Sequence, residues 1–286
     1  MSRKHIVRTV GVFGGSIILL LGIYGITFGD STTLTIDVFD VGQGDAILIR
    51  TPYHQSILID GGGDATVQEK LGRTLPFYDR ELDLVLLTHP HADHVNGLPG
   101  VLRHYDIRKV LATDIAHENS GYAEFLKTVK EKHIPLEGAR AGKIFRLGPD
   151  LTLEILTPNE DLSDRHIEDL NDSSIVARLI YRKKSFLFTG DAGRDVEESL
   201  LSGHVDLDSD VLKVGHHGSE GATTEHFLDS VTPEVALISV GKKNRYGHPH
   251  TALLERLMKH GIKTYRTDQE GDIRIKSDGE TIHVQP

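Results

Sequence analysis

Three histidines and an aspartate stand within six residues of this chain, at His89, His91, Asp93 and His94. They directly follow residues 82–87, which predict a strand buried on both faces. In extended backbone the side chains of His89 and His91 leave on the same side, so both imidazoles can reach one cation. Asp93 and His94 follow where a turn can aim them at a second cation. This spacing predicts a site for two adjacent metal ions at the end of a strand.

The alternative is a solvated loop that holds histidines by chance, in a chain with 17 of them. Four ligand-type side chains at HxHxDH spacing directly after a hydrophobic strand favour the metal site. The chain has no cysteine, so a disulfide framework and a thiolate-bound zinc are excluded. Histidine and carboxylate ligands suit Zn²⁺, and a site richer in oxygen also suits Mn²⁺, so two divalent ions, Zn or Mn, are the expected cofactors.

The hydrophobic pattern also predicts the elements that position these side chains. Tyr122, Phe125 and Val129 recur at helical spacing, which predicts an amphipathic helix, and another helix is expected over residues 95–104. Alternation from Leu34 onward predicts a half-buried strand. The end of the chain predicts edge strands joined by a turn at Asp278 and Gly279. Further strands are expected at residues 46–49, 56–59, 151–156, 175–180, 185–189, 210–214 and 235–239.

Five segments closely resemble motifs of the metallo-β-lactamase superfamily, whose signature is HxHxDH, and within it the extracellular hydrolase domain of ComEC/Rec2 competence proteins. The resemblance covers residues 33–286. It implies an α/β fold, the αββα sandwich of that superfamily, with a metal centre between the edges of two sheets. In chain order the segments are residues 40–46 (DVGQGDA), 88–94 (THPHADH), 189–192 (TGDA), 214–219 (VGHHGS) and 244–249 (NRYGHP).

Asp191 ends a predicted buried strand and follows Gly190, which permits a close approach of the backbone to a ligand. The TGDA context favours a carboxylate that bridges two metals. The alternative is an N-cap of the helix predicted over residues 194–201. The expected metal ligands are therefore His89, His91, Asp93, His94, Asp191 and His217.

His216 and His217 are adjacent at the end of another predicted strand. Because neighbouring side chains point in opposite directions at a strand end, we expect only one of them to bind metal. We assign His217 to the metal and His216 to substrate phosphate or proton transfer. By resemblance, His248 is a general acid or a substrate-binding residue, and an ordinary exposed histidine is the alternative. Asp93, His216 and His248 are thus the expected catalytic residues.

Two aspartates are expected to support the centre. Asp45 lies in a turn where Gly42 and Gly44 permit a tight reversal and a close backbone contact. Its carboxylate contacts either the substrate or a metal-binding histidine, or else it caps the turn. Asp60 stands where the superfamily has its strand-end aspartate, which by resemblance orients the histidine loop.

Residues 171–174 depart from the superfamily pattern. Many members carry another metal-binding histidine at this place, whereas the nearest one here, His166, is out of register. By resemblance to the ComEC-like branch, Asn171, Asp172 or a water molecule fills the position. The first metal then has one protein ligand fewer, and single-metal occupancy is the alternative.

The net charge of −10 argues against a surface coated with basic residues for nucleic acid. A polyanionic substrate must then be held locally, by the metals and a few cations. Lys213 and residues 242–245 are the candidates, with a solvated turn as the alternative. Ser219 either caps the next helix or donates a hydrogen bond to a phosphate.

Residues 10–28 are apolar and uncharged, and Arg3, Lys4 and Arg8 precede them. A helix of this length rises about 28 Å, close to the thickness of the hydrocarbon core. With the basic flank on the N-terminal side, this predicts a transmembrane signal anchor over residues 1–30 and an extracellular domain over residues 31–286. A cleaved secretory signal and a buried core helix are the alternatives.

A metal site built from histidines and carboxylates prepares the chain for hydrolysis, because bound water becomes acidic and the attacked oxygen is polarised. By resemblance, we expect a membrane-anchored phosphodiesterase that acts on DNA, with the competence machinery as a partner. We do not expect DNA uptake by this chain itself, since the channel of ComEC proteins is absent from it. The alternatives are a phosphodiesterase or phosphorylcholine esterase on envelope polymers, and a non-catalytic metal-stabilised module that binds DNA or a partner. β-Lactam hydrolysis ranks lower.

Overall fold

The computed structural model describes residues 32–117, 119–163, 165 and 167–286. The predicted membrane anchor and His166 lie outside the described residues. Thr33–Pro286 form one unit by their internal contacts. None of the helices in the described ranges is both long and apolar enough to cross a membrane.

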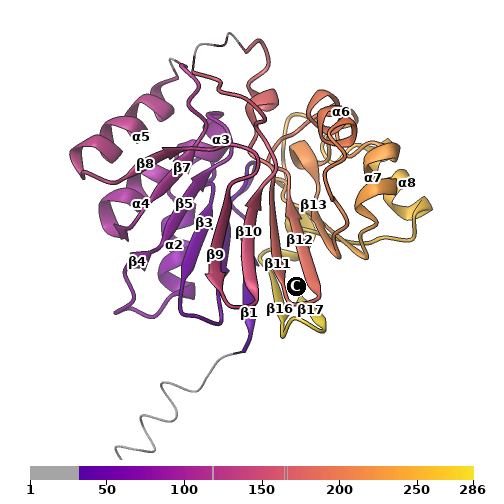
Figure 1. Ribbon diagram of the computed structural model, residues 1–286, viewed down its shortest axis with the longest axis horizontal. Helices are drawn as coiled ribbons and strands as arrows, with labels where there is room; N and C mark the ends of the chain where they lie inside the picture. Colours follow the sequence, from indigo (N-terminus) through magenta and orange to yellow (C-terminus); the bar gives the residue numbers. More distant parts are fainter. Residues whose placement is uncertain (1–31, 118, 164, 166) are drawn as a thin grey trace, which may run out of the picture. The chain divides into compact units, whose positions relative to one another are not determined.

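Two sheets pack face to face in the described part of the chain, and helices cover the outer face of each (Figure 1). Of the described residues, eight strands form the first sheet, in the order β17-β16-β1-β2-β3-β5-β7-β8. Seven form the second, in the order β15-β14-β13-β12-β11-β10-β9. This is the αββα sandwich that the resemblance implied.

The first sheet consists of β1 Leu34–Val38, β2 Ile47–Arg50, β3 Ser56–Ile59, β5 Leu84–Leu87, β7 Val110–Ala112, β8 Leu136–Gly138, β16 Ile273–Ser277 and β17 Ile282–Gln285. The second consists of β9 Ile144–Gly148, β10 Leu151–Ile155, β11 Ala177–Tyr181, β12 Lys184–Phe188, β13 Val211–Lys213, β14 Val235–Ile238 and β15 Lys263–Arg266. The short strands β4 Glu81–Leu82 and β6 Asp106–Ile107 pair with each other.

Helices α2 Thr66–Thr74, α4 Leu98–His104 and α5 Ser120–Glu131 pack on the first sheet, and α6 Arg194–Ser202, α7 Glu225–Val231 and α8 Thr251–Lys259 pack on the second. The remaining short elements are α3 Ala92–Val95, α9 Thr267–Glu270, η1 Leu170–Ser173 and η2 Gly215–Gly218. Asn119 begins α5 by accepting a hydrogen bond from the backbone N–H of Tyr122.

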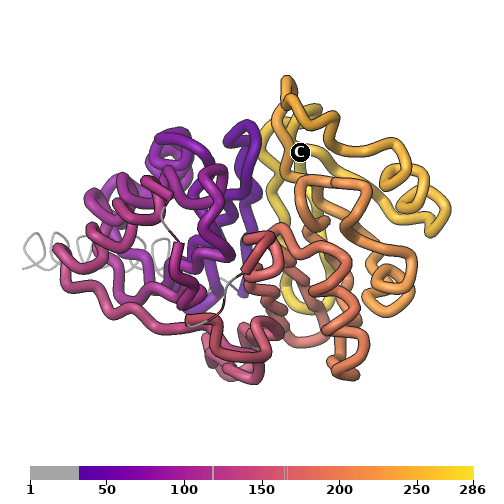
Figure 2. Tube along the Cα trace, turned by 90° about the horizontal axis from the view of Figure 1, so that it is seen from above, coloured from indigo at the N-terminus to yellow at the C-terminus, as the bar shows by residue number. Residues whose placement is uncertain are grey.

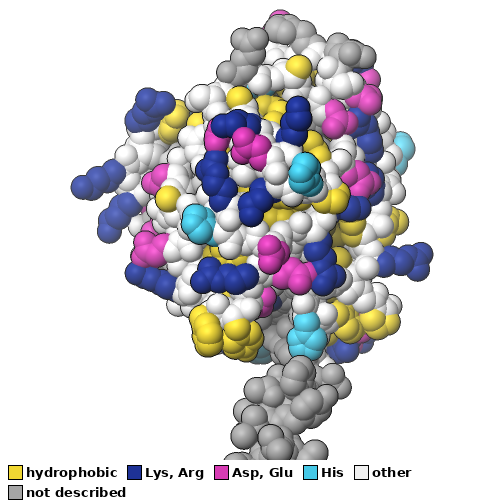
Figure 3. Space-filling model, turned by 90° about the vertical axis from the view of Figure 1, so that its left-hand side faces the viewer, with side chains coloured by type: hydrophobic (Ala, Val, Ile, Leu, Met, Phe, Trp, Pro, Cys, Tyr) yellow, Lys and Arg dark blue, Asp and Glu magenta, His cyan; other side chains and the backbone are white. Residues whose placement is uncertain are grey.

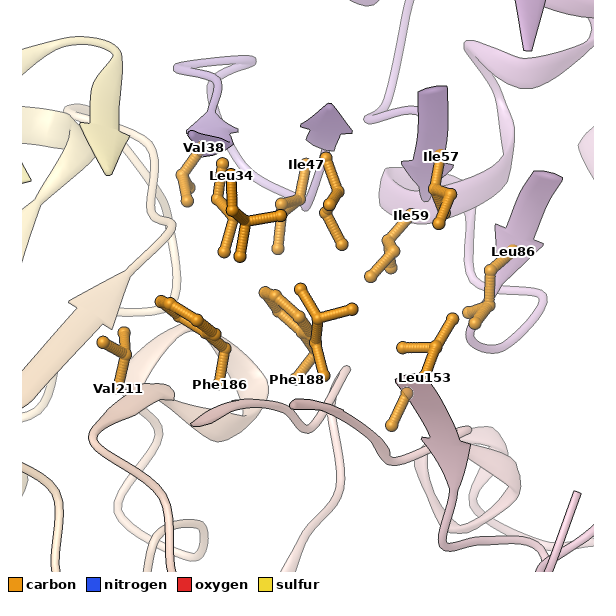
Figure 4. Packing of buried hydrophobic residues seen from close by; sticks show 14 of the residues in the cluster. Leu34, Val38, Ile47, Ile57, Ile59, Leu86, Leu153, Phe186, Phe188 and Val211 are labelled. Carbon is orange, nitrogen blue, oxygen red and sulfur yellow. The ribbon is translucent and has the colours of Figure 1, made fainter. Parts of the chain in front are cut away.

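The space between the sheets is filled by apolar side chains from both (Figure 4). Strands β3 and β5 are buried along their whole length, as expected for parallel strands covered on both faces. Labelled members of this core are Leu34, Val38, Ile47, Ile57, Ile59 and Leu86 of the first sheet and Leu153, Phe186, Phe188 and Val211 around the second.

Three expectations about local structure were wrong. β1 is not half-buried, because Arg50 and Arg274 from its two neighbouring strands cover Asp37, which is 3% exposed. The helix expected over residues 95–104 begins only at Leu98, as α4, because the N–H of Gly97 donates to Gly62 O at 3.1 Å instead of continuing the hydrogen bonds of α3. β16 is not an edge strand, because it pairs with β1 on one side and β17 on the other.

The strand directions bring the predicted ligands to one end of the sandwich. β3, β5 and β7 are parallel to one another, and β12, β13 and β14 are parallel in the second sheet. Hydrogen bonds join the loops at their carboxyl ends: Ile175 N donates to Thr88 O at 3.0 Å, and Ser239 Oγ donates to Gly44 O at 3.0 Å. Figure 2 shows the yellow C-terminal strands beside the indigo first strands, in agreement with the pairing of β16 and β1.

Candidate metal centre

Four ligand-type side chains meet where β5, β12 and β13 end. One ligand atom from each of Asp93, His94, Asp191 and His217 lies within 4.8 Å of the others. Asp191 Oδ2 lies 3.2 Å from His217 Nε2 and 3.3 Å from His94 Nε2. His217 Nε2 also lies 3.3 Å from Asp93 Oδ2. Imidazole nitrogens and carboxylate oxygens from three loops therefore converge as the ligands of a cation do.

His89 and His91 lie beside this group. His89 Nε2 is 3.0 Å from His91 Nδ1 and 3.9 Å from Asp191 Oδ2. Asp191 Oδ2 thus lies near one histidine from each half of the HxHxDH motif, His89 and His94, and Asp191 stays the candidate for a bridging carboxylate. It does not cap α6, because the N-cap residue there is Gly193.

The buried polar atoms of this group fit a bound metal. Among the described residues, His94 Nε2, His217 Nε2 and Asp191 Oδ1 are buried and have no hydrogen-bond partner. A buried polar atom without a partner costs about 1–3 kcal/mol. The two ring nitrogens both face Asp191 Oδ2 and are explained together if they bind a divalent cation with it, whereas Asp191 Oδ1 lies 3.8 Å from Lys213 Nζ.

Asp60 holds the histidine loop from behind. Its Oδ1 accepts a hydrogen bond from Thr88 N at 2.7 Å, and its Oδ2 accepts one from Thr88 Oγ1 at 2.7 Å. His94 Nδ1 lies 2.8 Å from the same Oδ2, so this nitrogen carries the proton and Nε2 faces Asp191. Asp60 thus lies behind His94, a candidate ligand, and fixes the orientation of its ring.

Replacing Asp60 by asparagine is expected to weaken metal binding by about 10–100-fold, because the amide nitrogen cannot accept the proton of His94 Nδ1 or of Thr88 Oγ1. Isothermal titration of the metal-free full chain with Zn²⁺ or Mn²⁺ measures the change. Asp64→Asn is the control, since Asp64 is an exposed carboxylate that accepts hydrogen bonds from Thr66 at the start of α2. Equal affinities for the Asp60→Asn variant and the unchanged protein would contradict this role.

Lys213 lies beneath the centre and cannot reach a substrate, so the expectation that it binds a polyanion was wrong. Its side chain is 0% exposed and forms an ion pair with Asp45 Oδ2. Lys213 Nζ donates a hydrogen bond to Gly190 O at 2.9 Å and lies 3.8 Å from Asp191 Oδ1. The other oxygen of Asp45 is 3.6 Å from His217 Nδ1, so this ion pair lies directly behind two candidate ligands.

The charges of the centre shift one another's protonation. Burial alone would lower the pKa of His94, but the carboxylates of Asp191 and Asp60 raise it well above its usual value. Burial alone would lower the pKa of His217, but Asp191 and Asp93 raise it to about 9. Burial would raise the pKa of Asp191, but His217 and His94 hold it well below its usual range. The carboxylates therefore favour positive charge at these ring nitrogens, which a divalent cation can supply in place of protons.

Gly44 lets the turn of residues 42–45 approach the histidine loop. Its φ is +120°, and a Cβ at this position would lie 1.9 Å from the carbonyl oxygen of Asp93. Gly42 also has a positive φ, of +76°, but a Cβ there would meet no atom within 4 Å. The turn therefore lies against the centre, as its glycines predicted. Of the two glycines, only Gly44 is required by a close contact with Asp93.

Gly44→Ala is expected to destabilise the protein by about 1–3 kcal/mol, since the strained φ and the overlap with Asp93 both oppose folding. Gly42→Ala, which meets only the φ penalty, should cost about 1 kcal/mol. Urea unfolding followed by circular dichroism measures both variants. A smaller loss for Gly44→Ala than for Gly42→Ala would show that the close contact is not present.

A cavity of about 290 Å³ opens onto the centre. The His216 and His248 rings lie 5.5 Å apart in it, and Tyr246 stacks on His248 with ring centroids 5.7 Å apart. Its lining residues are Gln43, His91, Ala92, Asp93, Asp191, His216, His217, Tyr246 and His248.

His216 and His217 both face this cavity, which corrects the expectation that they point in opposite directions. Their φ angles of 46° and 53° are left-handed, so the strand has ended before them. His217 is buried against the carboxylates, and its Nδ1 lies 2.9 Å from Ser239 O. His216 is half-buried and has no close contact with those carboxylates.

Asn171 and Ser219 are not among the residues that line the cavity. Asn171 is buried, and its Oδ1 has no hydrogen-bond partner within the described ranges. Its neighbour Ser174 accepts a hydrogen bond from Asp191 N at 3.2 Å. Ser219 is not the cap of α7, since Thr224 accepts the capping hydrogen bond from Phe227 N.

Sequence reasoning missed the supporting contacts of Thr88, Ser174 and Ser239 and the position of Gln43 in the cavity. Thr88 and Gln43 lie inside the matching motifs, so their positions beside candidate ligands were a usable signal. Ser174 and Ser239 act through a hydroxyl or a backbone carbonyl in ordinary strand flanks, and no pattern in the sequence marks them.

Residues 39–242 match the sequence profile of the metallo-beta-lactamase superfamily. The chain belongs to this superfamily. The metallo-beta-lactamase fold implies that its clustered histidines and aspartates bind divalent metal.

Curated relatives include competence proteins. The chain is 31% identical over 271 residues to ComE operon protein 3 of Bacillus subtilis, covering 88% of this chain and 34% of the relative. It is 34% identical over 243 residues to competence protein ComA of Neisseria gonorrhoeae, covering 84% of this chain and 32% of the relative. The chain thus spans about a third of the length of these relatives and has a metallo-hydrolase fold related to ComEC/Rec2 competence proteins.

Solved structures share the metallo-beta-lactamase fold at low sequence identity. YhfI from Bacillus subtilis superposes with a TM-score of 0.58 at 13% identity, over 85% of this chain and 100% of that protein. Igni18, a metallo hydrolase from Ignicoccus hospitalis, superposes with a TM-score of 0.55 at 16% identity, over 84% of this chain and 98% of that protein.

Proposed function

We propose that this chain is a metal-dependent phosphodiesterase that cleaves DNA and is anchored at the outer face of a cell membrane by its N-terminal segment. The observation that carries the proposal is the convergence of the unpaired ring nitrogens of His94 and His217 on Asp191 Oδ2 at an open cavity. A structural metal site is closed by its protein ligands, whereas a catalytic one keeps a position open for water or substrate.

The shape of the site suits one diester linkage of a longer polymer. A volume of about 290 Å³ is at the lower end of the range for small-molecule sites. The scissile phosphate can enter it while the rest of the polymer lies across the surface outside. Because the chain is related to competence proteins, we propose DNA as the polymeric substrate.

Different residues of the site have different roles in the proposed hydrolysis. When bound, divalent metal ions lower the pKa of water toward about 7 and neutralise the non-bridging oxygens of phosphate. Asp60 and the carbonyl oxygen of Ser239 orient the imidazoles of His94 and His217 from behind. His248 and His216 stand in the cavity where a phosphate would lie. Burial and His216 lower the pKa of His248 to about 4, so His248 holds a proton for the leaving oxygen once the negative charge of a bound phosphate beside it raises this pKa.

Substrate preference tests the proposal directly. The metal-loaded full chain is incubated with labelled single- and double-stranded DNA and with p-nitrophenyl phosphorylcholine. We expect cleavage of DNA that stops when the metal is chelated. Turnover of the phosphorylcholine ester alone would replace DNA by an envelope polymer as the substrate. Tight DNA binding without cleavage would show a recruiting module instead of an enzyme.

His248→Gln is expected to lower the rate of DNA cleavage by about 10²-fold or more, because an alkoxide leaving group needs a proton. The same variant should hydrolyse bis-p-nitrophenyl phosphate at nearly the original rate, since p-nitrophenolate leaves without one. The ratio of the two rates is the measured quantity. His250→Gln, two residues on and 45% exposed at its side chain, is the control. Equal losses with both substrates would assign His248 to binding rather than to proton transfer.

A further inference from the structure

Two adjacent aromatic side chains are exposed in the turn between α2 and β4. Phe77 is 85% exposed and Tyr78 is 74% exposed. Their rings pack edge to face with centroids 5.3 Å apart, so the pair presents one apolar projection. Burying such a side chain stabilises a protein or complex by about 1.5–3 kcal/mol. Phe77 and Tyr78 do not contribute this free energy while they are exposed to water. Single exposed apolar residues are ordinary, but a paired aromatic projection indicates a surface that another phase or molecule covers.

The pair lies at the end of the sandwich opposite the metal centre. α2 starts just after Gly61, whose N–H donates to His94 O at 2.8 Å, and runs away from that end. After the turn, β5 runs back and delivers the histidine loop. Figure 1 shows α2 and β4 toward the lower end of the sandwich and α3 toward the upper end.

The folded domain also begins at this lower end. β1 starts at Leu34, and Thr35 is paired with Arg50 at the far end of β2. The next turn leads to Ser56, whose N–H donates to Asp83 Oδ2 at 2.8 Å, just before β5. The start of β1 and the aromatic pair are therefore on the same end of the first sheet.

We infer that Phe77 and Tyr78 form a bilayer-contacting surface that inserts into the interface of the membrane. The inference rests on the membrane attachment in the proposed function and not on the nuclease activity. Residues 29–33 join the apolar segment 10–28 to β1, and a linker of about five residues spans at most about 18 Å. The lower end of the domain is then held close to the bilayer, and the metal centre faces away from it toward a soluble polymer.

The charges at this end indicate an apolar contact rather than an electrostatic one. Several basic side chains near this end have acidic partners: Arg73 pairs with Glu69, Arg108 with Glu81, and Lys183 with Glu280. Arg80, in the turn itself, lies over the ring of Tyr105. Figure 3 shows Lys and Arg interspersed with Asp and Glu on this side, with hydrophobic side chains gathered toward its lower end. Aromatic rings bind at the headgroup level without any need for anionic lipid, so neutral phosphatidylcholine should suffice.

Fluorescence tests the contact, because the chain has no tryptophan. The full-length Phe77→Trp variant is reconstituted in phosphatidylcholine nanodiscs with plain or dibrominated acyl chains. We expect its emission to shift to shorter wavelength and to be quenched about twofold by the bromines, since an interfacial indole reaches the upper acyl chains. The control is Tyr246→Trp, 52% exposed at the metal-centre end, which should be unaffected.

Each other outcome overturns the contact in a different way. Variants that associate with nanodiscs but show no quenching at position 77 would show that the domain does not touch the bilayer there. Equal quenching at position 246 would overturn the orientation. A blue shift in detergent that grows with protein concentration would make a second copy of the chain the occupant. Failure of the full chain to associate with nanodiscs would overturn the anchoring as well, whereas the DNA cleavage assay would be unaffected by any of these results.

Discussion

Replacing Asp191 by asparagine is expected to lower metal-dependent hydrolysis of bis-p-nitrophenyl phosphate by about 10³-fold, which corresponds to about 4 kcal/mol. Asp191 Oδ2 lies within 3.9 Å of the ring nitrogens of His89, His94 and His217. No other carboxylate of the described residues has recorded contacts with all three. Asparagine keeps the shape but loses the charge that holds a cation among these imidazoles.

The control for this variant is Asp195→Asn, which removes an exposed carboxylate from the first turn of α6, four residues on. Circular dichroism checks that both variants are folded, and kcat/KM is measured at saturating Zn²⁺ or Mn²⁺. A loss of less than tenfold in a folded Asp191→Asn protein would mean that another carboxylate holds the metal.

Lys213→Met is expected to destabilise the protein by about 3–5 kcal/mol, since it leaves the carboxylate of Asp45 buried without a countercharge. Burial would lower the pKa of Lys213, but Asp45 and Asp191 raise it above its usual value, so the side chain is an ammonium ion in the folded protein. Methionine has a similar length and no charge. Urea unfolding with linear extrapolation measures the loss.

Lys183→Met provides the matched comparison. Lys183 is paired with Glu280 at 2.8 Å, but its side chain is 75% exposed, so its loss should cost less than about 1 kcal/mol. The double variant Lys213→Met with Asp45→Leu should recover part of the stability, because the carboxylate that formed the close ion pair with Lys213 is removed as well. A cost for Lys213→Met no larger than that for Lys183→Met would contradict the buried ion pair.

Much of the fold follows from hydrophobic periodicity, because periodicity records which side of an element is buried. The strand predicted over residues 56–59 coincides with β3, and the helix predicted from Tyr122, Phe125 and Val129 is α5. The break between α3 and α4 does not follow from it. That break depends on the hydrogen bond from Gly97 N to Gly62 O, a contact with another part of the chain that no local pattern contains.

The pairing of β16 with β1 is a similar case. The local sequence of β16 alternates as an edge strand does, and only the long return of the chain places it inside a sheet. The arginine that it brings over Asp37 then buries a side chain that alternation assigns to solvent. Contacts between residues so far apart in the sequence depend on the whole fold. They cannot be predicted from the pattern of a few neighbouring residues.

The candidate ligands could be named from spacing, but their partners could not. The motifs point to His94, Asp191 and His217 one loop at a time. The pairing of Lys213 with Asp45 depends instead on the approach of β13 to the turn at Gly44, and it reverses the role expected for Lys213. A lysine before a histidine pair is equally compatible with substrate binding and with burial until the second sheet is in place.

The measurement that decides whether these residues form a metal centre is anomalous X-ray diffraction from crystals of the full chain soaked in Mn²⁺ or Zn²⁺. The centre described above predicts anomalous density within bonding distance of Asp191 Oδ2 and of the Nε2 atoms of His94 and His217, and none there in Asp191→Asn crystals. Strong anomalous density elsewhere and none between these three side chains would show that they are not the metal site, and the proposed hydrolysis would lose its basis.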